Sequence, residues 1–213
     1  MAKLIWGNPT DRTYQTGVDQ GVLYINDVGY AWNGLMKVTE STSPGEPREH
    51  YVDGFKYLAF AGLEDFEATV EAMSAPREFS ECDGYGSLGN GLIVSQQPHK
   101  AFDFSYRTLL GDAAVGEKLG YQIHIVYNAV AIRESYEAVS IGDQATPSIN
   151  TWNITTRPVK VPHKRQTSHF IVDSRFAPSD ILSTLSERLY GGASTDASLP
   201  TPSELMSMFG YTG

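Results

Sequence analysis

Apolar and polar residues alternate with a period of two along most of the chain, in short runs rich in Val, Ile, Tyr, Phe, Trp and Thr. Such alternation is typical of β-strands with one buried face, and the Gly, Pro, Asn and Asp residues between the runs mark turns. We expect strands at residues 21–26, 30–40, 50–60, 63–73, 101–109, 119–129, 148–156 and 168–173. The pattern predicts a mainly β protein, and the uneven spacing of the runs argues against a solenoid or propeller.

One segment has helical periodicity instead. Residues 181–189 place their apolar side chains on one helical face, a Pro-Ser-Asp sequence precedes them, and two glycines follow. A helix this short is marginal alone, so we expect its apolar stripe to lie on a sheet. The C-terminal residues 193–213 are expected to form an arm, with room for a last helical turn within 199–206.

Side chains of opposite character alternate across the expected strand at 63–73. Its apolar side is made by Phe66, Ala68, Val70 and Ala72, and its polar side by Asp65, Glu67, Thr69 and Glu71. Three carboxylates in a row cannot form a core, because like charges on one strand face cost stability. Two further strands show the same alternation, with Asp103, Ser105, Gln122 and His124 among their polar positions. We expect an antiparallel sheet with one dry and one polar face, and an ordinary solvated face is the plain alternative.

A polar segment between two expected strands is expected to be a long loop. It comprises Ser41, Thr42, Ser43, Pro44, Gly45, Glu46, Pro47, Arg48 and Glu49. A polar loop of this length in a compact domain is usually either functional or disordered. Residues 82–99 are expected to form a second, glycine-rich loop.

Length and charge narrow the class of protein. A chain of 213 residues suits one domain, and the net charge of −9 argues against a grip on phosphate backbones, which needs a basic patch. The same charge suits a surface past which DNA slides without sticking. No apolar run is long enough to cross a bilayer, and the first residues lack a signal-peptide core, so we expect synthesis in the cytoplasm. The single cysteine, Cys82, allows no intrachain disulfide.

Motifs for catalysis and metal binding are weak. The G-x-G-x-x-G sequence at 84–89 is followed by a turn and a strand rather than a helix, so a glycine-rich loop is the better interpretation. The histidines show no H-x-x-x-H spacing, and no serine stands in a G-x-S-x-G sequence. A hydrolase that uses His124 or His169 therefore lacks a signature. The sequence predicts no enzyme, no cofactor and no metal site.

Several segments taken together resemble one protein family. They are GVDQGVLY at 17–24, YVDGFKY at 51–57, EDFEATVEA at 64–72, FSYRT at 104–108, GYQIHIVYN at 120–128 and LYG at 189–191. In order and spacing they are similar to the major tail tube proteins of long-tailed, siphovirus-type bacteriophages, in particular phages of actinobacteria. The resemblance covers the chain from about residue 17 to 190.

The resemblance implies a two-sheet β-sandwich or flattened barrel with one flanking α-helix, a fold shared with the tube of the type VI secretion system. It implies a single tail-tube domain over 1–213, with an N-terminal arm at 1–20, a stacking loop at 41–49 and a C-terminal arm at 193–213. Such subunits form rings, usually hexamers, whose inner sheets join into one β-barrel around a lumen. The rings stack into a tube.

The resemblance also implies the partners and the location. The chain would bind copies of itself and meet the tape measure, tail terminator and distal tail proteins in the virion tail, after synthesis in the host cytoplasm. DNA would pass through the lumen without specific binding, and no membrane is involved. We expect the lumen to be lined by Asp65, Glu67, Thr69, Glu71, Asp103, Ser105, Gln122 and His124. A six-fold ring would carry 6 × −9 = −54 formal charges.

A stand-alone carbohydrate-binding β-sandwich is the alternative from another class. It is suggested by the 12 Tyr and 3 Trp residues, since sugar rings stack on exposed aromatic side chains. Trp6, Trp32 and Trp152 are widely scattered along the sequence, however, which favours structural roles for them.

Overall fold

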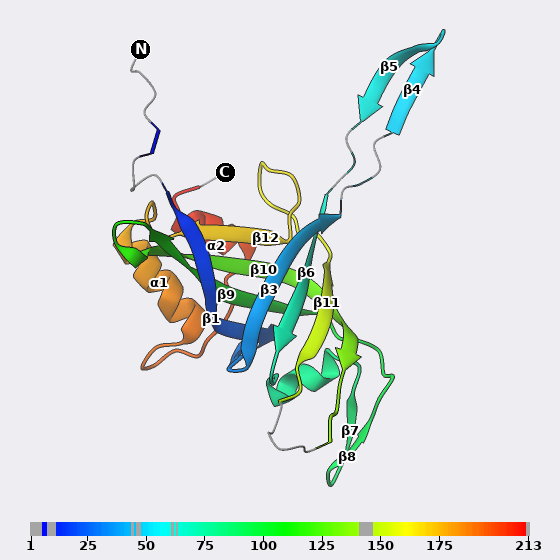
Figure 1. Ribbon diagram of the computed structural model, residues 1–213, viewed down its shortest axis with the longest axis vertical. Helices are drawn as coiled ribbons and strands as arrows, with labels where there is room; N and C mark the ends of the chain where they lie inside the picture. The colour runs from blue at the N-terminus through cyan, green and yellow to red at the C-terminus, as the bar shows by residue number, and fades with distance from the viewer. Residues whose placement is uncertain are drawn as a thin grey trace.

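The computed structural model describes residues 6–7, 12–43, 45, 48–60, 62, 64–140 and 147–211. Within them the chain is mainly β, as the sequence predicts (Figure 1). The strands are β1 Tyr14–Ile25, β2 Val28–Ala31, β3 Leu35–Ser43, β4 Arg48–Val52, β5 Phe55–Phe60, β6 Asp65–Ala72, β7 Gly86–Gly89, β8 Leu92–Val94, β9 Phe102–Asp112, β10 Gly116–Tyr136, β11 Asn150–Thr156 and β12 His169–Asp173. A 3-10 helix spans Arg77–Glu81, and the α-helices are α1 Ser179–Tyr190 and α2 Pro202–Met208.

One antiparallel, 8-stranded sheet forms the body, in the order β2-β1-β9-β10-β11-β6-β3, with β12 also paired to β10. The long strand β10 organises it: one edge pairs with β9, and the other pairs first with β12 and then with β11. The β9–β10 register shifts between Val126 and Ala129, and Asn128 there has a φ of 53°. This irregularity lets β10 leave one layer of the fold and enter the other.

The sheet therefore folds over itself into two layers. The first layer contains β2, β1, β9, β12 and the first part of β10, and the second contains the rest of β10 with β11, β6 and β3. Leu23 of β1 and Val70 of β6 belong to one buried cluster although three strands separate β1 from β6 in the sheet order. In Figure 1, β3, β6 and β11 cross over β1, β9 and β10. The expected sandwich is thus made by one curled sheet.

Aromatic rings fill the space between the layers at one end. Trp152 of β11 packs edge-on against Phe79 and Trp32, at ring-centroid distances of 5.3 and 5.9 Å. The Trp152 Nε1–H donates to Oδ1 of the buried Asp83 at 2.8 Å. Burial beside them raises the pKa of the Cys82 thiol to about 12, so this side chain is a core residue without nucleophilic character at neutral pH.

The two helices cover the outer face of the first layer (Figure 1). Leu185 and Leu189 of α1 and Leu205 of α2 are buried in one cluster with Ile123 and Ile125 of β10. The expected helix is confirmed. The helix α2 begins with a capping box between Thr201 and Glu204 and is packed on the body, so the segment expected as a C-terminal arm contains a structured helix. Among the described residues, neither helix is long and apolar enough to cross a membrane.

Several expected boundaries were wrong. Ser41, Thr42 and Ser43 are not loop residues: they pair with β6 as the end of β3. Pro44, Glu46 and Pro47 of the same expected loop lie outside the described residues. The expected strand at 50–60 is two strands, because Asp53 and Gly54 adopt positive φ and reverse the chain. The strand at 30–40 is likewise split between β2 and β3, and β1 begins at Tyr14, inside the segment expected as an N-terminal arm.

Candidate assembly surfaces

The outer face of the second layer is polar and carries the carboxylates singled out in the sequence. In register with one another lie Lys37, Thr39, Ser41 and Ser43 of β3, Asp65, Glu67, Thr69 and Glu71 of β6, and Thr151, Asn153 and Thr155 of β11. On the opposite side of β6, Ala68, Val70 and Ala72 are buried in the core. We call this surface of β3, β6 and β11 the acidic face.

Hydroxyl, amide and carboxylate groups dominate the acidic face. Its three carboxylates and one ammonium sum to −3 + 1 = −2. Lys37 Nζ lies 2.7 Å from Glu71 Oε1, and Thr69 Oγ1 donates to Asn153 Oδ1 at 3.1 Å. An exposed pair such as Lys37–Glu71 stabilises a fold by only about 0–1 kcal/mol. The acidic face is therefore expected to bind nucleic acid and apolar surfaces only weakly.

Half of the residues expected to line a lumen lie away from the acidic face. Ser105, 1% exposed, contacts the Tyr24 hydroxyl beneath the helices, and His124, 3% exposed, lies between the layers. Burial within a single chain excludes both from a solvent-facing wall. Asp103 accepts a hydrogen bond from the Asn128 N–H, and burial raises its pKa. Gln122 donates to Asp173 Oδ2 at 3.0 Å, apart from the acidic face. For Ser105 and His124 the expectation failed because helices cover one face of β9 and β10 and the second layer covers the other.

A second candidate surface is the hairpin of β4 and β5, which extends away from the folded body (Figure 1). The two strands form their own two-stranded sheet. Its side chains are largely apolar yet exposed, 79% for Phe55 and 72% for Tyr57, and Tyr51, Val52 and Leu58 are exposed as well. Tyr51 Oη donates to Glu49 at 2.6 Å, and Lys56 pairs with the same carboxylate. The sequence signal for the turn was an Asp-Gly pair between alternating apolar residues.

The smaller hairpin of β7 and β8 lies at the opposite end of the long axis in Figure 1. Leu88, Leu92 and Ile93 are exposed on it. The segment at 82–99, expected to be a glycine-rich loop, therefore contains two short strands, and part of the sequence at 84–89 belongs to β7. Apolar side chains are presented at both ends of the molecule.

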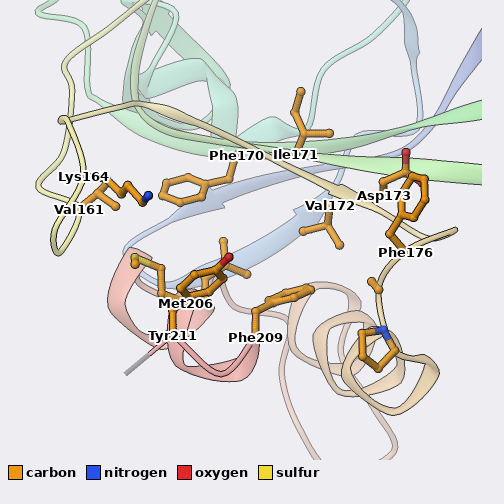
Figure 2. Close-up of a pocket in the computed structure, with 13 residues that line it drawn as sticks. Val161, Lys164, Phe170, Ile171, Val172, Asp173, Phe176, Met206, Phe209 and Tyr211 are labelled. Carbon is orange, nitrogen blue, oxygen red and sulfur yellow. The ribbon is translucent and has the colours of Figure 1, made fainter. Parts of the chain in front are cut away.

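A third candidate surface is an apolar cavity of about 380 Å³ beside β12. Figure 2 shows Phe170 and Val172 of β12, Phe176 and the α2-side residues Phe209 and Tyr211 around it. Among the described strands β12 pairs with β10 alone, so its other edge presents free backbone groups next to this cavity. An extended segment that adds to β12 would bury apolar side chains here.

The fold also brings together three side chains that the sequence did not connect. Glu40 of β3 reaches across from the second layer to His124 of β10 and His169 of β12. The hydrogen bond from His124 lowers the pKa of Glu40 to about 2, and burial lowers the pKa of His169 to about 4. These residues are 45 and more positions apart, so no spacing signal marks them.

Comparison with known proteins gives weak likenesses. No protein-family model and no curated protein matches the chain. Among solved structures, the sheath-tube complex of an extracellular contractile injection system, PVC, is 13% identical over 72% of this chain and 88% of that chain, with a TM-score of 0.38. The anti-feeding prophage baseplate is 12% identical over 81% and 97%, with a TM-score of 0.36. The PVC sheath/tube terminator is 13% identical over 80% and 99%, with a TM-score of 0.33. Scores this low do not establish a shared fold.

Proposed function

We propose that this chain is a structural subunit of a bacteriophage tail tube, which self-assembles into stacked rings around an electronegative lumen for DNA. The observation that carries the proposal is the β4–β5 hairpin with its exposed apolar side chains. A two-stranded hairpin is at best marginally stable alone in water. Covering a large apolar side chain contributes about 1.5–3 kcal/mol, so Phe55 and Tyr57 strongly favour a partner surface.

The position of the apolar surfaces suits head-to-tail stacking. The β4–β5 and β7–β8 hairpins lie at opposite ends of the long axis (Figure 1). A contact between two different surfaces of identical subunits can be repeated without limit, which is the geometry of a filament or tube. We infer that the stacking element expected at 41–49 extends into the hairpin through Phe60.

Free strand edges suit the closure of a ring. Among the described strands, β3 and β12 each have one edge that pairs with no other strand, and an exposed edge is a template for pairing with another chain. Joining second layers edge to edge would close a barrel, which covers the free edge of β3. The acidic face of β3, β6 and β11 would then line the lumen, with Asp65, Glu67, Thr69 and Glu71 as its central row.

The charge of that face suits free passage of DNA. If six subunits form a ring, the acidic face contributes 6 × −2 = −12 charges to each ring. These charges repel DNA phosphates within a Debye length of roughly 8–10 Å. The subunit is then a non-enzymatic building block whose partners are copies of itself and the tape measure, tail terminator and distal tail proteins of the virion.

Electron microscopy of the purified chain tests the proposal directly. We expect negative-stain images of concentrated protein to show rings or tubes, because the exposed hairpin and the free edges are covered only on assembly. Analytical ultracentrifugation across the same concentrations should show the corresponding large species. A compact monomer at every concentration would refute the proposal.

A carbohydrate-binding module has less support. Two of its three candidate stacking residues, Trp32 and Trp152, are core residues, and Trp6 is 81% exposed. Specific binding on a glycan array by the monomeric chain would favour this alternative, whereas a tube subunit should bind no glycan.

Reversing the charge of the acidic face should slow DNA release. In virions whose tubes contain Asp65→Lys, Glu67→Lys and Glu71→Lys together, we expect normal tubes and DNA ejection at least about fivefold slower, because lysines bind phosphates. Ejection can be followed with a fluorescent DNA-binding dye, and the defect should shrink as salt is raised.

A matched control changes the same number of charges away from the acidic face. Glu78, Glu117 and Glu187 are exposed, and their replacement by lysine adds the same six charges. Ejection from that variant should be unchanged. Equal rates for both variants and the natural subunit would show that the acidic face does not line the lumen.

A further inference from the structure

We propose that Glu40, His124 and His169 form a binding site for a divalent transition-metal ion, best suited to Zn²⁺, that joins the two layers of the sheet. Two imidazoles and one carboxylate are a ligand set that zinc accepts, with its fourth position left to water. The ligand atoms of the three side chains all lie within 4.8 Å of one another. The inference does not depend on the proposed function, because it concerns the interior of one chain.

Two of the three spacings between ligand atoms are close to what an ion requires. His124 Nδ1 lies 3.0 Å from Glu40 Oε1 and 3.2 Å from His169 Nε2. With metal–ligand bonds of about 2.0–2.2 Å, neighbouring ligands of a tetrahedral ion lie about 3.3–3.6 Å apart. An ion between the three groups therefore needs shifts of only a few tenths of an ångström at those two contacts.

The hydrogen bonding of the cluster leaves lone pairs that an ion would satisfy. His124 Nδ1 faces a carboxylate oxygen, which only accepts, and also faces a nitrogen of His169. A neutral imidazole carries one N–H, so a proton on Nδ1 has to be shared between these two neighbours. An ion at the point of convergence would be bound by all three groups at once.

Surrounding residues hold the ligands as the outer shell of a metal site does. The other ring nitrogen of His124, Nε2, lies 3.0 Å from Thr108 Oγ1, which fixes the ring orientation. Tyr106 Oη donates to Glu40 Oε1 at 2.6 Å, and its ring is stacked on His124 with centroids 4.6 Å apart. Phe66 packs against the His169 ring at 4.4 Å. The ligands are thus positioned by both layers.

Two of the three ligands, Glu40 and His124, line a cavity that opens to solvent. A space of about 580 Å³ between β3 and the first layer is lined by Glu40, His124, Tyr106, Thr108 and Gln122. An ion could enter here and keep a water molecule in its open position. Soft or borderline ions with nitrogen ligands are favoured over Mg²⁺ and Ca²⁺, which prefer oxygen ligands alone.

Binding should stabilise the chain, because Glu40 comes from the second layer and both histidines from the first. The test uses the full chain without a histidine tag, stripped with EDTA and dialysed. Titration calorimetry with ZnCl₂ should give one ion per chain. At free Zn²⁺ a hundredfold above the dissociation constant, the melting temperature should rise by roughly 5–10 °C. Co²⁺ should give the visible absorption of a four-coordinate site.

Matched variants assign the site. Glu40→Gln and His169→Gln should each weaken Zn²⁺ binding more than about 100-fold, and Thr108→Val, which keeps all three ligands, about tenfold. His163→Gln, which removes an exposed histidine, should change neither affinity nor melting shift. The proposal is overturned if the natural chain takes up no Zn²⁺, if Mg²⁺ gives the same shift, or if Glu40→Gln and His169→Gln bind as tightly as the natural chain.

Discussion

Replacing Phe55 and Tyr57 by serine is expected to abolish tube formation while the chain remains folded. Both side chains lie on the β4–β5 hairpin, outside the main sheet and its buried clusters, so the core loses nothing. The loss of two large apolar contacts, at about 1.5–3 kcal/mol each, removes roughly 3–6 kcal/mol from every subunit contact. That corresponds to at least about a hundredfold weaker association, since 1.4 kcal/mol is tenfold.

The measurement is the critical concentration for assembly, taken from sedimentation and checked by microscopy. The matched control is Phe55→Leu with Tyr57→Phe, which keeps most of the apolar area and should still form tubes. Circular dichroism and the unfolding midpoint of both variants should equal those of the natural chain. Tubes from the serine variant at the natural concentration would show that the hairpin is not an assembly element.

Asp83→Ala should be among the most destabilising single substitutions, with a loss of about 3–5 kcal/mol. The Asp83 carboxylate is 2% exposed, pairs with Arg133 through both oxygens and accepts the Trp152 N–H. Removing it leaves a guanidinium and an indole N–H without their buried acceptor. The guanidinium also lies over the Trp152 ring at 5.5 Å, so its displacement disturbs the aromatic cluster between the layers.

Urea unfolding followed by tryptophan fluorescence measures this loss. The matched control is Glu81→Ala, two residues away, whose carboxylate is 65% exposed and lies 3.2 Å from Lys100 Nζ. Its loss should cost no more than about 1 kcal/mol, because water screens an exposed pair. Similar losses for both variants would mean that the Asp83 network does not hold the core together.

The local pattern of apolar and polar residues was sufficient to predict most of the secondary structure. The alternation at 63–73 correctly placed Ala68 and Val70 inward and Glu67 outward, and the apolar stripe at 181–189 correctly gave a helix on a sheet. The Asp53-Gly54 pair is also a local signal for a turn, although residues 50–60 were expected to form one strand. Its positive φ values are what divide 50–60 into a hairpin.

What the sequence could not provide was the path of the sheet in three dimensions. Ser105 and His124 occupy polar positions of alternating strands, and a strand by itself does not reveal that both of its faces are covered. The covering depends on where β10 bends and on the helices that return after it. The Glu40, His124 and His169 cluster depends on the same long-range folding, because its members come from three strands and two layers.

The order of strands in the sheet has a consequence during synthesis. The hairpin strands β4 and β5 are adjacent in the chain, and a hairpin forms in about 1–10 μs. Strand β1 instead pairs with β9, so Tyr24 can pair only after Asp103 has been synthesised, 103 − 24 = 79 positions later. At about 5–20 residues per second, the 102 − 60 = 42 positions from Phe60 to Phe102 take roughly 2–8 seconds to emerge. A newly synthesised chain therefore exposes the apolar side chains of the β4–β5 hairpin for seconds before the main sheet can form. Neighbouring chains on one messenger RNA must be kept apart during that time.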